Sequence, residues 1–193
     1  MKVYWLVPLA YLLGSVPTGY ILGSLAGVDV QTTGSGNIGA TNVARTVGQW
    51  QGILTLLADT AKGFIPVILG VTLGLTPAES AFVGIAAFLG HLYPVFLRFR
   101  GGKGVATALG VLLALTPLGT LLLIGVFAVV IFWSRVTSLG SIATAVAAPV
   151  TLWLMSYPIS VVAMSMFLAV MVVIRHRANI RRLAGGTEPK LGS

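Results

Sequence analysis

Apolar residues run along the chain in long stretches, which short polar or glycine-rich segments separate. A helix needs about 20 mostly apolar residues to cross the hydrocarbon core of a bilayer. Six stretches come close to that length: 3–25, 51–74, 78–97, 117–133, 137–156 and 158–175. A seventh, 104–116, is shorter and ends before Pro117, which disfavours a helical conformation at the preceding residue. The pattern predicts an all-α integral membrane protein with seven transmembrane helices in a single domain, 1–193.

Composition excludes several classes of protein. Of the 193 residues, 56% are hydrophobic and 8% are charged, far below the roughly 25% charged residues of soluble domains. The chain has no cysteine, which rules out disulfides, thiolate catalysis and Cys-ligated metals. The formal charge of +8 does not indicate nucleic-acid binding, because we find no soluble module and no aromatic platform.

The basic residues predict the orientation in the membrane. The turns at 75–77, 116–117 and 156–158 carry no Lys or Arg, and basic residues follow the odd-numbered spans. These are Arg45, Arg98, Arg100, Lys103, Arg135, Arg175, Arg177, Arg181, Arg182 and Lys190, which leaves only Lys2 and Lys62 elsewhere. Because cytoplasmic loops are enriched in Lys and Arg, the N-terminus is expected outside and the C-terminus in the cytoplasm. Six crossings would place the basic tail on the same side as the N-terminus, so we favour seven.

The long loop 26–50 contains the sequence GSGNIGATNVAR, residues 34–45, which we call motif one. Its glycines allow backbone amides to approach an oxyanion closely. Hydroxyl and amide side chains add neutral donors, and an arginine can bind phosphate through two hydrogen bonds. A flexible loop is the alternative interpretation. The candidate binding residues are Gly34, Ser35, Gly36, Asn37, Gly39, Thr41 and Arg45.

A second glycine-rich sequence, GGKGVAT at 101–107, leads directly into the predicted fourth span, and we call it motif two. Amides at the start of a helix favour anions, so Gly101, Gly102, Lys103 and Gly104 are candidate ligands. The motif is not a Walker A loop, because Lys103 is followed by glycine rather than Ser or Thr. Arg98 and Arg100, just upstream, could equally fix topology or contact lipid headgroups.

Motif three, RHRANIRRLAGGTE at 175–188, begins at the cytoplasmic end of the last span. His176 and Asn179 are three residues apart and would share one face of a continuing helix. The arginines could bind substrate or acidic lipid, and Glu188 is expected to anchor the basic tail. Ser141, near the start of its own span, is within possible reach of these loops.

Polar residues inside the spans have structural interpretations. Asp59 and Lys62 are three residues apart and are expected to form an ion pair within one helix. We interpret His91 as a buried structural histidine. With four acidic residues and two histidines in the chain, no metal site is expected.

The three motifs, at this spacing on a chain of this length, resemble the bacterial PlsY family of acyl-phosphate:glycerol-3-phosphate acyltransferases. The resemblance covers essentially the whole chain and implies transfer of a fatty acyl group from acyl phosphate to the 1-hydroxyl of glycerol 3-phosphate. The products would be lysophosphatidic acid and phosphate, and no cofactor would be needed. It also implies a multi-pass protein of the bacterial inner membrane, with its active site on the cytoplasmic side.

The resemblance implies that motifs one and two bind phosphate and that His176 and Asn179 are the functional pair of motif three. Our hypothesis for their roles is that Arg45 and Lys103 hold glycerol 3-phosphate from the cytosol, while Ser141, His176 and Asn179 close its pocket. Backbone amides of motif one would bind acyl phosphate from the bilayer, and membrane lipid is a further expected partner. The expected catalytic residues are Ser35, Arg45, Lys103, His176 and Asn179. The general base would be either His176 or a substrate phosphate, and we favour the phosphate.

Two other functions use similar residues. A phosphate-ester transporter would need the same glycines and cations, but all of them lie on one predicted face, and we see no transporter-type repeat. A protein that only binds acidic lipid would leave motif one unexplained.

Overall fold

A computed structural model describes residues 4–192, which form helices and loops without strands. Lys2 and the first residue of the predicted span 3–25 lie outside this range. The chain divides into two compact units: unit 1 ends at Leu115, and unit 2 begins at Thr116.

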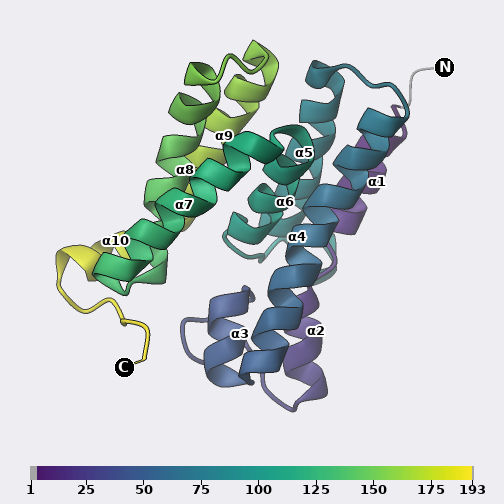
Figure 1. The fold of residues 1–193 in the computed structure, drawn as a ribbon. Helices are drawn as coiled ribbons and strands as arrows, with labels where there is room; N and C mark the ends of the chain where they lie inside the picture. The colour runs from purple at the N-terminus through teal and green to yellow at the C-terminus, as the bar shows by residue number, and fades with distance from the viewer. Residues whose placement is uncertain (1–3, 193) are drawn as a thin grey trace. The chain divides into compact units, whose positions relative to one another are not determined.

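Unit 1 is built around the long helix α4. Its elements are α1 (Leu6–Gly14), α2 (Thr18–Leu25), α3 (Ala40–Thr46), α4 (Gln49–Thr72), α5 (Pro77–Leu92), the 3₁₀ helix η1 (Val95–Leu97) and α6 (Val105–Leu115). α4 packs against α1, α5 and α6 along its length, and α1 also packs against α5. α2 and α3 contact α4 and flank its N-terminal half (Figure 1).

The predicted span 3–25 contains two helices with a break between them, and Leu6–Leu25 as a whole is long and apolar enough to cross a membrane. α1 ends at Gly14 and α2 begins at Thr18, with Pro17 in the N-cap position. Proline has no backbone N–H to continue the hydrogen-bond ladder, so the carbonyls of the preceding turn must find other donors. The break leaves the carbonyl of Val16 available to a side chain of another helix.

The loop 26–50 contains the seven-residue helix α3, which the hydropathy pattern did not indicate. α3 holds the second half of motif one and buries Asn42 and Val43. Val43 joins Val30 and Ile38 in a small hydrophobic cluster under the loop. The glycine-rich segment is therefore packed against a core of its own.

Unit 2 consists of α7 (Pro117–Ser134), α8 (Thr137–Leu154), α9 (Ile159–Arg175) and α10 (Arg177–Ala184). α8 packs against both α7 and α9, and α10 contacts the end of α9 (Figure 1). Pro117 begins α7, which confirms the predicted boundary at 116–117.

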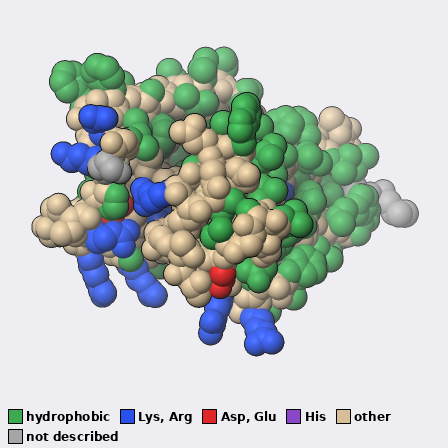
Figure 2. All heavy atoms as spheres, turned by 90° about the horizontal axis from the view of Figure 1, so that it is seen from below, with side chains coloured by type: hydrophobic (Ala, Val, Ile, Leu, Met, Phe, Trp, Pro, Cys, Tyr) green, Lys and Arg blue, Asp and Glu red, His purple; other side chains and the backbone are tan. Residues whose placement is uncertain are grey.

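Each of the seven predicted spans contains a helix. Within residues 4–192, five stretches are long and apolar enough to cross a membrane: Leu6–Leu25, Gln49–Thr72, Pro77–Leu97, Pro117–Ser134 and Thr137–Leu154. α9 and α10 together form a sixth candidate, bent by 59°. α6 has 11 residues and a length of about 16 Å, short of the roughly 30 Å of a hydrocarbon core. Figure 2 shows broad apolar surfaces (green) and Lys and Arg side chains (blue) that project from the face in view.

Candidate functional site

Motif one begins in a tight loop that Asn42 holds from inside. Asn42 lies in the first turn of α3 and is 2% exposed. Its carboxamide oxygen accepts a hydrogen bond from the amide of Ser35 at 2.8 Å. Its NH₂ group donates to the carbonyls of Val30 and Thr33, each at 3.1 Å. One buried side chain thus fixes the loop to α3.

Gly34 adopts a left-handed backbone conformation, which glycine reaches more easily than any other residue. Its φ is +64°, and a Cβ there would lie 2.4 Å from Oδ1 of Asn42 and 2.7 Å from Cγ2 of Thr46. The amide of Gly36 donates to the carbonyl of Thr33 at 3.2 Å. Since the amides of Ser35 and Gly36 both have acceptors within the loop, an anion bound here would use other amides or side chains.

The polar side chains of motif one lie largely at the surface. Ser35, Thr41 and Arg45 are exposed, and Asn37 is half-buried. Arg45 is in the last turn of α3, one turn beyond Asn42. The buried amide therefore organises the loop, while hydroxyls and a guanidinium remain accessible to a ligand.

Motif two rests on the C-terminal end of α5. The amide of Gly102 donates to the carbonyl of His91 at 3.1 Å. A Cβ on Gly101 would lie 2.1 Å from that same carbonyl oxygen, and one on Gly102 would lie 2.2 Å from Nε2 of His91. Gly104 has φ +83° and leaves no space for a Cβ beside Phe88. The glycines are required because the loop lies directly on the helix end.

The two loops of unit 1 adjoin. The side-chain amide of Gln31 donates to the carbonyl of Arg100 at 3.1 Å, next to motif two. Leu97 of η1 packs against the hydrophobic cluster under motif one. Motif one and the segment that leads into motif two are therefore in contact, although the two motifs lie more than 50 residues apart in sequence.

Motif three contains a bend at His176. α9 ends at Arg175, α10 begins at Arg177, and the two axes differ by 59°. Nδ1 of His176 lies 2.8 Å from the carbonyl oxygen of Val172, and the ring is 2% exposed. A carbonyl can only accept, so this nitrogen carries the proton, and in a neutral ring Nε2 is then the acceptor. His176 therefore caps the last turn of α9.

Glu188 is the centre of a hydrogen-bonded cluster at the start of α8. Its carboxylate accepts from Oγ of Ser138 at 2.7 Å, from Nδ2 of Asn179 at 2.5 Å and from Nε of Arg182 at 2.6 Å. The amide of Leu191 also donates to the carbonyl of Arg135 at 2.7 Å. This confirms the expectation that Glu188 anchors the basic tail.

The cluster perturbs the ionisation of Glu188. Burial acts to raise the pKa of the carboxyl, but the hydrogen bonds from Ser138, Asn179 and Arg182 and the positive charge of Arg182 outweigh it. The pKa is therefore held below its ordinary value of 4.5. The carboxylate is ionised at neutral pH.

The candidate residues are distributed over both units. Ser35, Arg45 and Lys103 belong to unit 1, and His176 and Asn179 belong to unit 2. So does Ser141, whose hydroxyl donates to the carbonyl of Thr137 at 2.9 Å in the first turn of α8. Within unit 2, Asn179 and His176 are both buried, and Asn179 is tied to Glu188.

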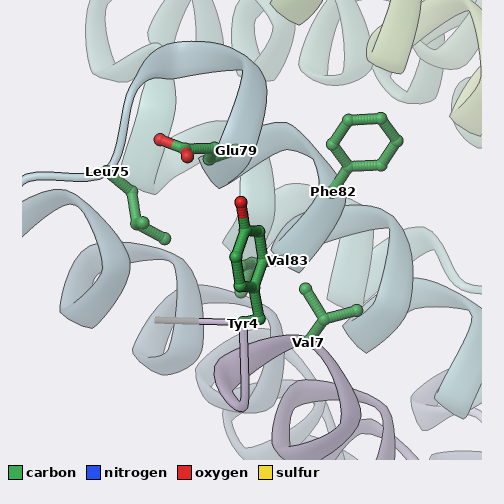
Figure 3. A pocket seen from close by; sticks show the side chains of 6 residues that line it. All are labelled: Tyr4, Val7, Leu75, Glu79, Phe82 and Val83. Atoms are coloured by element: carbon green, nitrogen blue, oxygen red, sulfur yellow. The ribbon is translucent and has the colours of Figure 1, made fainter. Parts of the chain in front are cut away.

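A pocket of about 220 Å³ lies elsewhere in unit 1, at the opposite end of α5 from His91 (Figure 3). It is lined by Tyr4, Val7, Leu75, Glu79, Phe82 and Val83. Glu79 belongs to the capping box of α5, where its carboxylate accepts from the amide and hydroxyl of Thr76. An apolar wall with one carboxylate does not suit a phosphate.

Sequence reasoning did not single out Asn42, Gln31 or Ser138. Asn42 was one polar residue among several in motif one, and only its burial distinguishes it. Gln31 donates a hydrogen bond to the carbonyl of Arg100, 69 positions away, and Ser138 donates one to Glu188, 50 positions away. No local pattern could have identified these partners.

Comparisons with known proteins agree with this architecture. A family model described as glycerol-3-phosphate acyltransferase matches residues 4–186. A glycerol-3-phosphate acyltransferase of Geotalea daltonii is 52% identical over 93% of this chain and 92% of its own length. One from Aquifex aeolicus is 44% identical over 97% of this chain and 98% of its own.

Solved structures match over the same range. A crystal structure of PlsY (YgiH), an integral membrane glycerol 3-phosphate acyltransferase in its glycerol 3-phosphate form, has a TM-score of 0.94. It is 43% identical and covers 97% of this chain and 94% of that chain. The lysophosphatidic acid form gives a TM-score of 0.91. The chain therefore belongs to the PlsY family of integral membrane glycerol-3-phosphate acyltransferases.

Proposed function

We propose that this protein transfers a fatty acyl group from acyl phosphate to the 1-hydroxyl of glycerol 3-phosphate. The hydroxyl oxygen attacks the acyl carbonyl carbon, the bond from that carbon to the phosphate oxygen breaks, and phosphate leaves. The hydroxyl proton passes to a phosphate oxygen. The products are lysophosphatidic acid and inorganic phosphate.

The observation that carries this proposal is the contact, made by Gln31 and Leu97, between the loop of motif one and the segment that leads into motif two. The two motifs supply an arginine, a lysine and several hydroxyl and amide groups within unit 1. Phosphate is bound well by such a set. The solved relatives are described with glycerol 3-phosphate and with lysophosphatidic acid, which are the acceptor and the product of this reaction.

Acyl phosphate suits the proposed site as donor because it is an activated anhydride with a good leaving group. Catalysis can then depend on orientation and on stabilisation of negative charge, without an acyl-enzyme. A chain of about 15 methylenes at about 0.8 kcal/mol each holds such a donor in the bilayer by roughly 12 kcal/mol. A membrane enzyme can meet the donor there while glycerol 3-phosphate arrives from the cytosol.

The proposed roles follow from position and chemistry. Arg45 and Lys103 bind phosphate, and the amides of motif one beyond Gly36 bind the donor. His176 and Asn179 take part as the family resemblance implies. His176 uses Nδ1 to cap Val172, which suits a group that orients more than one that shuttles protons. The base we propose is a substrate phosphate, whose second pKa is near 6.

We further propose seven crossings, with the N-terminus outside and the C-terminus in the cytoplasm of a bacterial inner membrane. The absence of basic residues from three tight turns supports this orientation. In this arrangement α6 is the partial span, and motifs one to three all face the cytoplasm.

The test is an assay with purified protein in lipid, with acyl phosphate or acyl-CoA as donor. Lysophosphatidic acid and free phosphate are measured together. We expect product from acyl phosphate alone, lost in Arg45→Ala and in Lys103→Ala, whereas Lys190→Ala serves as the matched basic control and retains activity. Product from acyl-CoA alone would overturn the donor assignment, and no product with either donor from folded protein would overturn the reaction.

A further inference from the structure

Three ionisable side chains meet in the interior of unit 1, away from the exposed groups of motif one. Asp59 and Lys62 of α4 form an ion pair with an Nζ to Oδ1 distance of 2.8 Å, and Nδ1 of His91 of α5 lies 3.7 Å from the same carboxylate oxygen. Asp59, Lys62 and His91 are 2%, 4% and 3% exposed. The three side chains form a buried polar chain across two helices.

This polar chain extends in both directions. At one end, Nζ of Lys62 donates to the carbonyl of Val16 at 2.9 Å, in the break between α1 and α2. At the other end, the imidazole of His91 lies against motif two, where Nε2 occupies the space that a side chain at Gly102 would need. The row of polar side chains thus extends from the break between α1 and α2 to the glycine-rich loop of motif two.

A buried ion pair contributes little net stability to helix packing, because moving two charges out of water costs about as much free energy as their attraction returns. Replacement of such pairs by apolar residues of similar volume is often neutral or stabilising. α4 already packs closely on α6, where a Cβ on Gly63 would lie 2.2 Å from the carbonyl oxygen of Thr107. This contact between α4 and α6 involves none of the three ionisable side chains, which instead connect α4 with α5 and with Val16.

His91 contacts the loop with both its backbone and its ring. The backbone carbonyl of His91 accepts a hydrogen bond from the amide of Gly102 at 3.1 Å. Its ring packs against the same glycine, on the side where a Cβ would stand. Asp59, beside Nδ1, favours one orientation of the imidazole, and Lys62 holds Asp59. Gly102 immediately precedes Lys103, so a rotation of the ring would displace the loop that carries the cation.

We propose that His91 and Asp59 are positioning residues for motif two. They hold the Gly101–Gly104 backbone in the conformation that binds the phosphate of glycerol 3-phosphate, without contacting the substrate themselves. This inference rests on the proposed role of motif two in phosphate binding.

The first experiment separates KM from kcat. His91→Ala, His91→Gln and the double variant Asp59→Asn with Lys62→Met are assayed in lipid with both substrates varied. We expect His91→Ala to raise KM for glycerol 3-phosphate about tenfold, which corresponds to about 1.4 kcal/mol and is close to the value of one hydrogen bond to a charged group. kcat and KM for the acyl donor should stay within about twofold of the parent values, because the loop is displaced but the reacting groups remain.

The other variants refine the expectation. Gln at position 91 still fills the space beside Gly102, so it should restore most of the affinity that Ala loses. The double variant removes both charges at nearly constant volume and should raise KM about fivefold while the protein remains folded. Ser80→Ala is the matched control for the variants of His91. Ser80 is buried on α5, as His91 is, but it lies at the opposite end of that helix.

A second experiment tests the contact itself. Gly102→Ala alone should raise KM strongly, because its Cβ would meet Nε2 of His91. Combined with His91→Ala, which vacates that space, Gly102→Ala should add little to the effect of His91→Ala alone. Additive effects in this cycle would show that the two positions act independently and would overturn the proposal.

The outcomes separate the two levels of inference. If Lys103→Ala abolishes product and Gly102→Ala raises KM for glycerol 3-phosphate but the position 59 and 91 variants do not, the positioning role is wrong and the phosphate site stands. If Lys103→Ala keeps its activity with that KM unchanged, the role of motif two in phosphate binding is wrong. A lower kcat together with a raised KM for both substrates, accompanied by a lowered unfolding temperature, would indicate that His91 only supports the fold.

Discussion

Glu188→Ala should release the C-terminal segment from unit 2. The change removes the acceptor of Ser138 and of Asn179, which are each 5% exposed, and an unsatisfied buried donor costs about 1–3 kcal/mol. Arg182 is 37% exposed, so its ion pair contributes only about 0–1 kcal/mol. The sum is about 2–7 kcal/mol of local stability, equivalent to at least a roughly 30-fold increase in opening of the segment.

Hydrogen exchange measures this opening directly. The amides of Thr187 and Leu191 donate to Arg182 at 2.8 Å and to Arg135 at 2.7 Å, and both should exchange at least about 30-fold faster in Glu188→Ala. Glu188→Gln keeps an acceptor oxygen and should show a smaller increase. Thr187→Ala is the control, since its hydroxyl makes only a 3.5 Å contact. Unchanged protection in Glu188→Ala would show that the cluster does not hold the tail.

The same cluster should make the tail sensitive to acid. The folded pKa of Glu188 is lower than its ordinary value of 4.5, so its contribution is fully present above that value. The contribution is lost as the pH falls from 4.5 through the lower folded value. Exchange of the Leu191 amide, corrected for its intrinsic pH dependence, should therefore increase in acid in the parent protein. In Glu188→Gln this increase should be absent, and an equal increase in both proteins would assign the effect to another group.

Three further predictions concern the motifs. Asn42→Asp would place a carboxylate oxygen against the carbonyls of Val30 and Thr33, and a cost of about 2–4 kcal/mol should appear as a lower unfolding temperature and a raised KM for glycerol 3-phosphate. Gly104→Ala would overlap Phe88 at a φ of +83°, and we expect a loss of about 2–4 kcal/mol in thermal unfolding; a neutral result would contradict the described loop. His176→Ala should lower kcat but leave the acidic limb of the pH–rate profile unchanged, whereas loss or a shift of that limb would make His176 the base.

Hydropathy predicted where the helices are, because burial in lipid requires long apolar stretches. It could not predict the break at Pro17, since apolar residues continue on both sides, nor α3, whose seven residues gain their stability from packing on α2 and α4. The ion pair between Asp59 and Lys62 was predicted correctly, because residues three apart on a helix are neighbours. The contact of this pair with His91 joins different helices and has no local signal.

The candidate site shows the same division. Residue types and glycine spacing predicted phosphate chemistry in motifs one and two, because few other patterns combine these donors. The roles of Asn42 and Gln31 depend on burial and on partners far away in sequence. The ligands at a site can therefore be proposed from composition, whereas the groups that hold them in place require coordinates.

The pairing of Asp59 with Lys62 inside one helix also bears on how the protein enters the membrane during synthesis. On translocon scales a lone Asp or Lys at the centre of a span costs about 2.5–3.5 kcal/mol, so two separate charges would cost about 5–7 kcal/mol. A pair within α4 can form before α1, α2 or α5 has packed against it, because both partners belong to the same segment. α4 can therefore be inserted as an electrically neutral unit, and the charges reach Val16 and His91 only when the helices assemble within the bilayer.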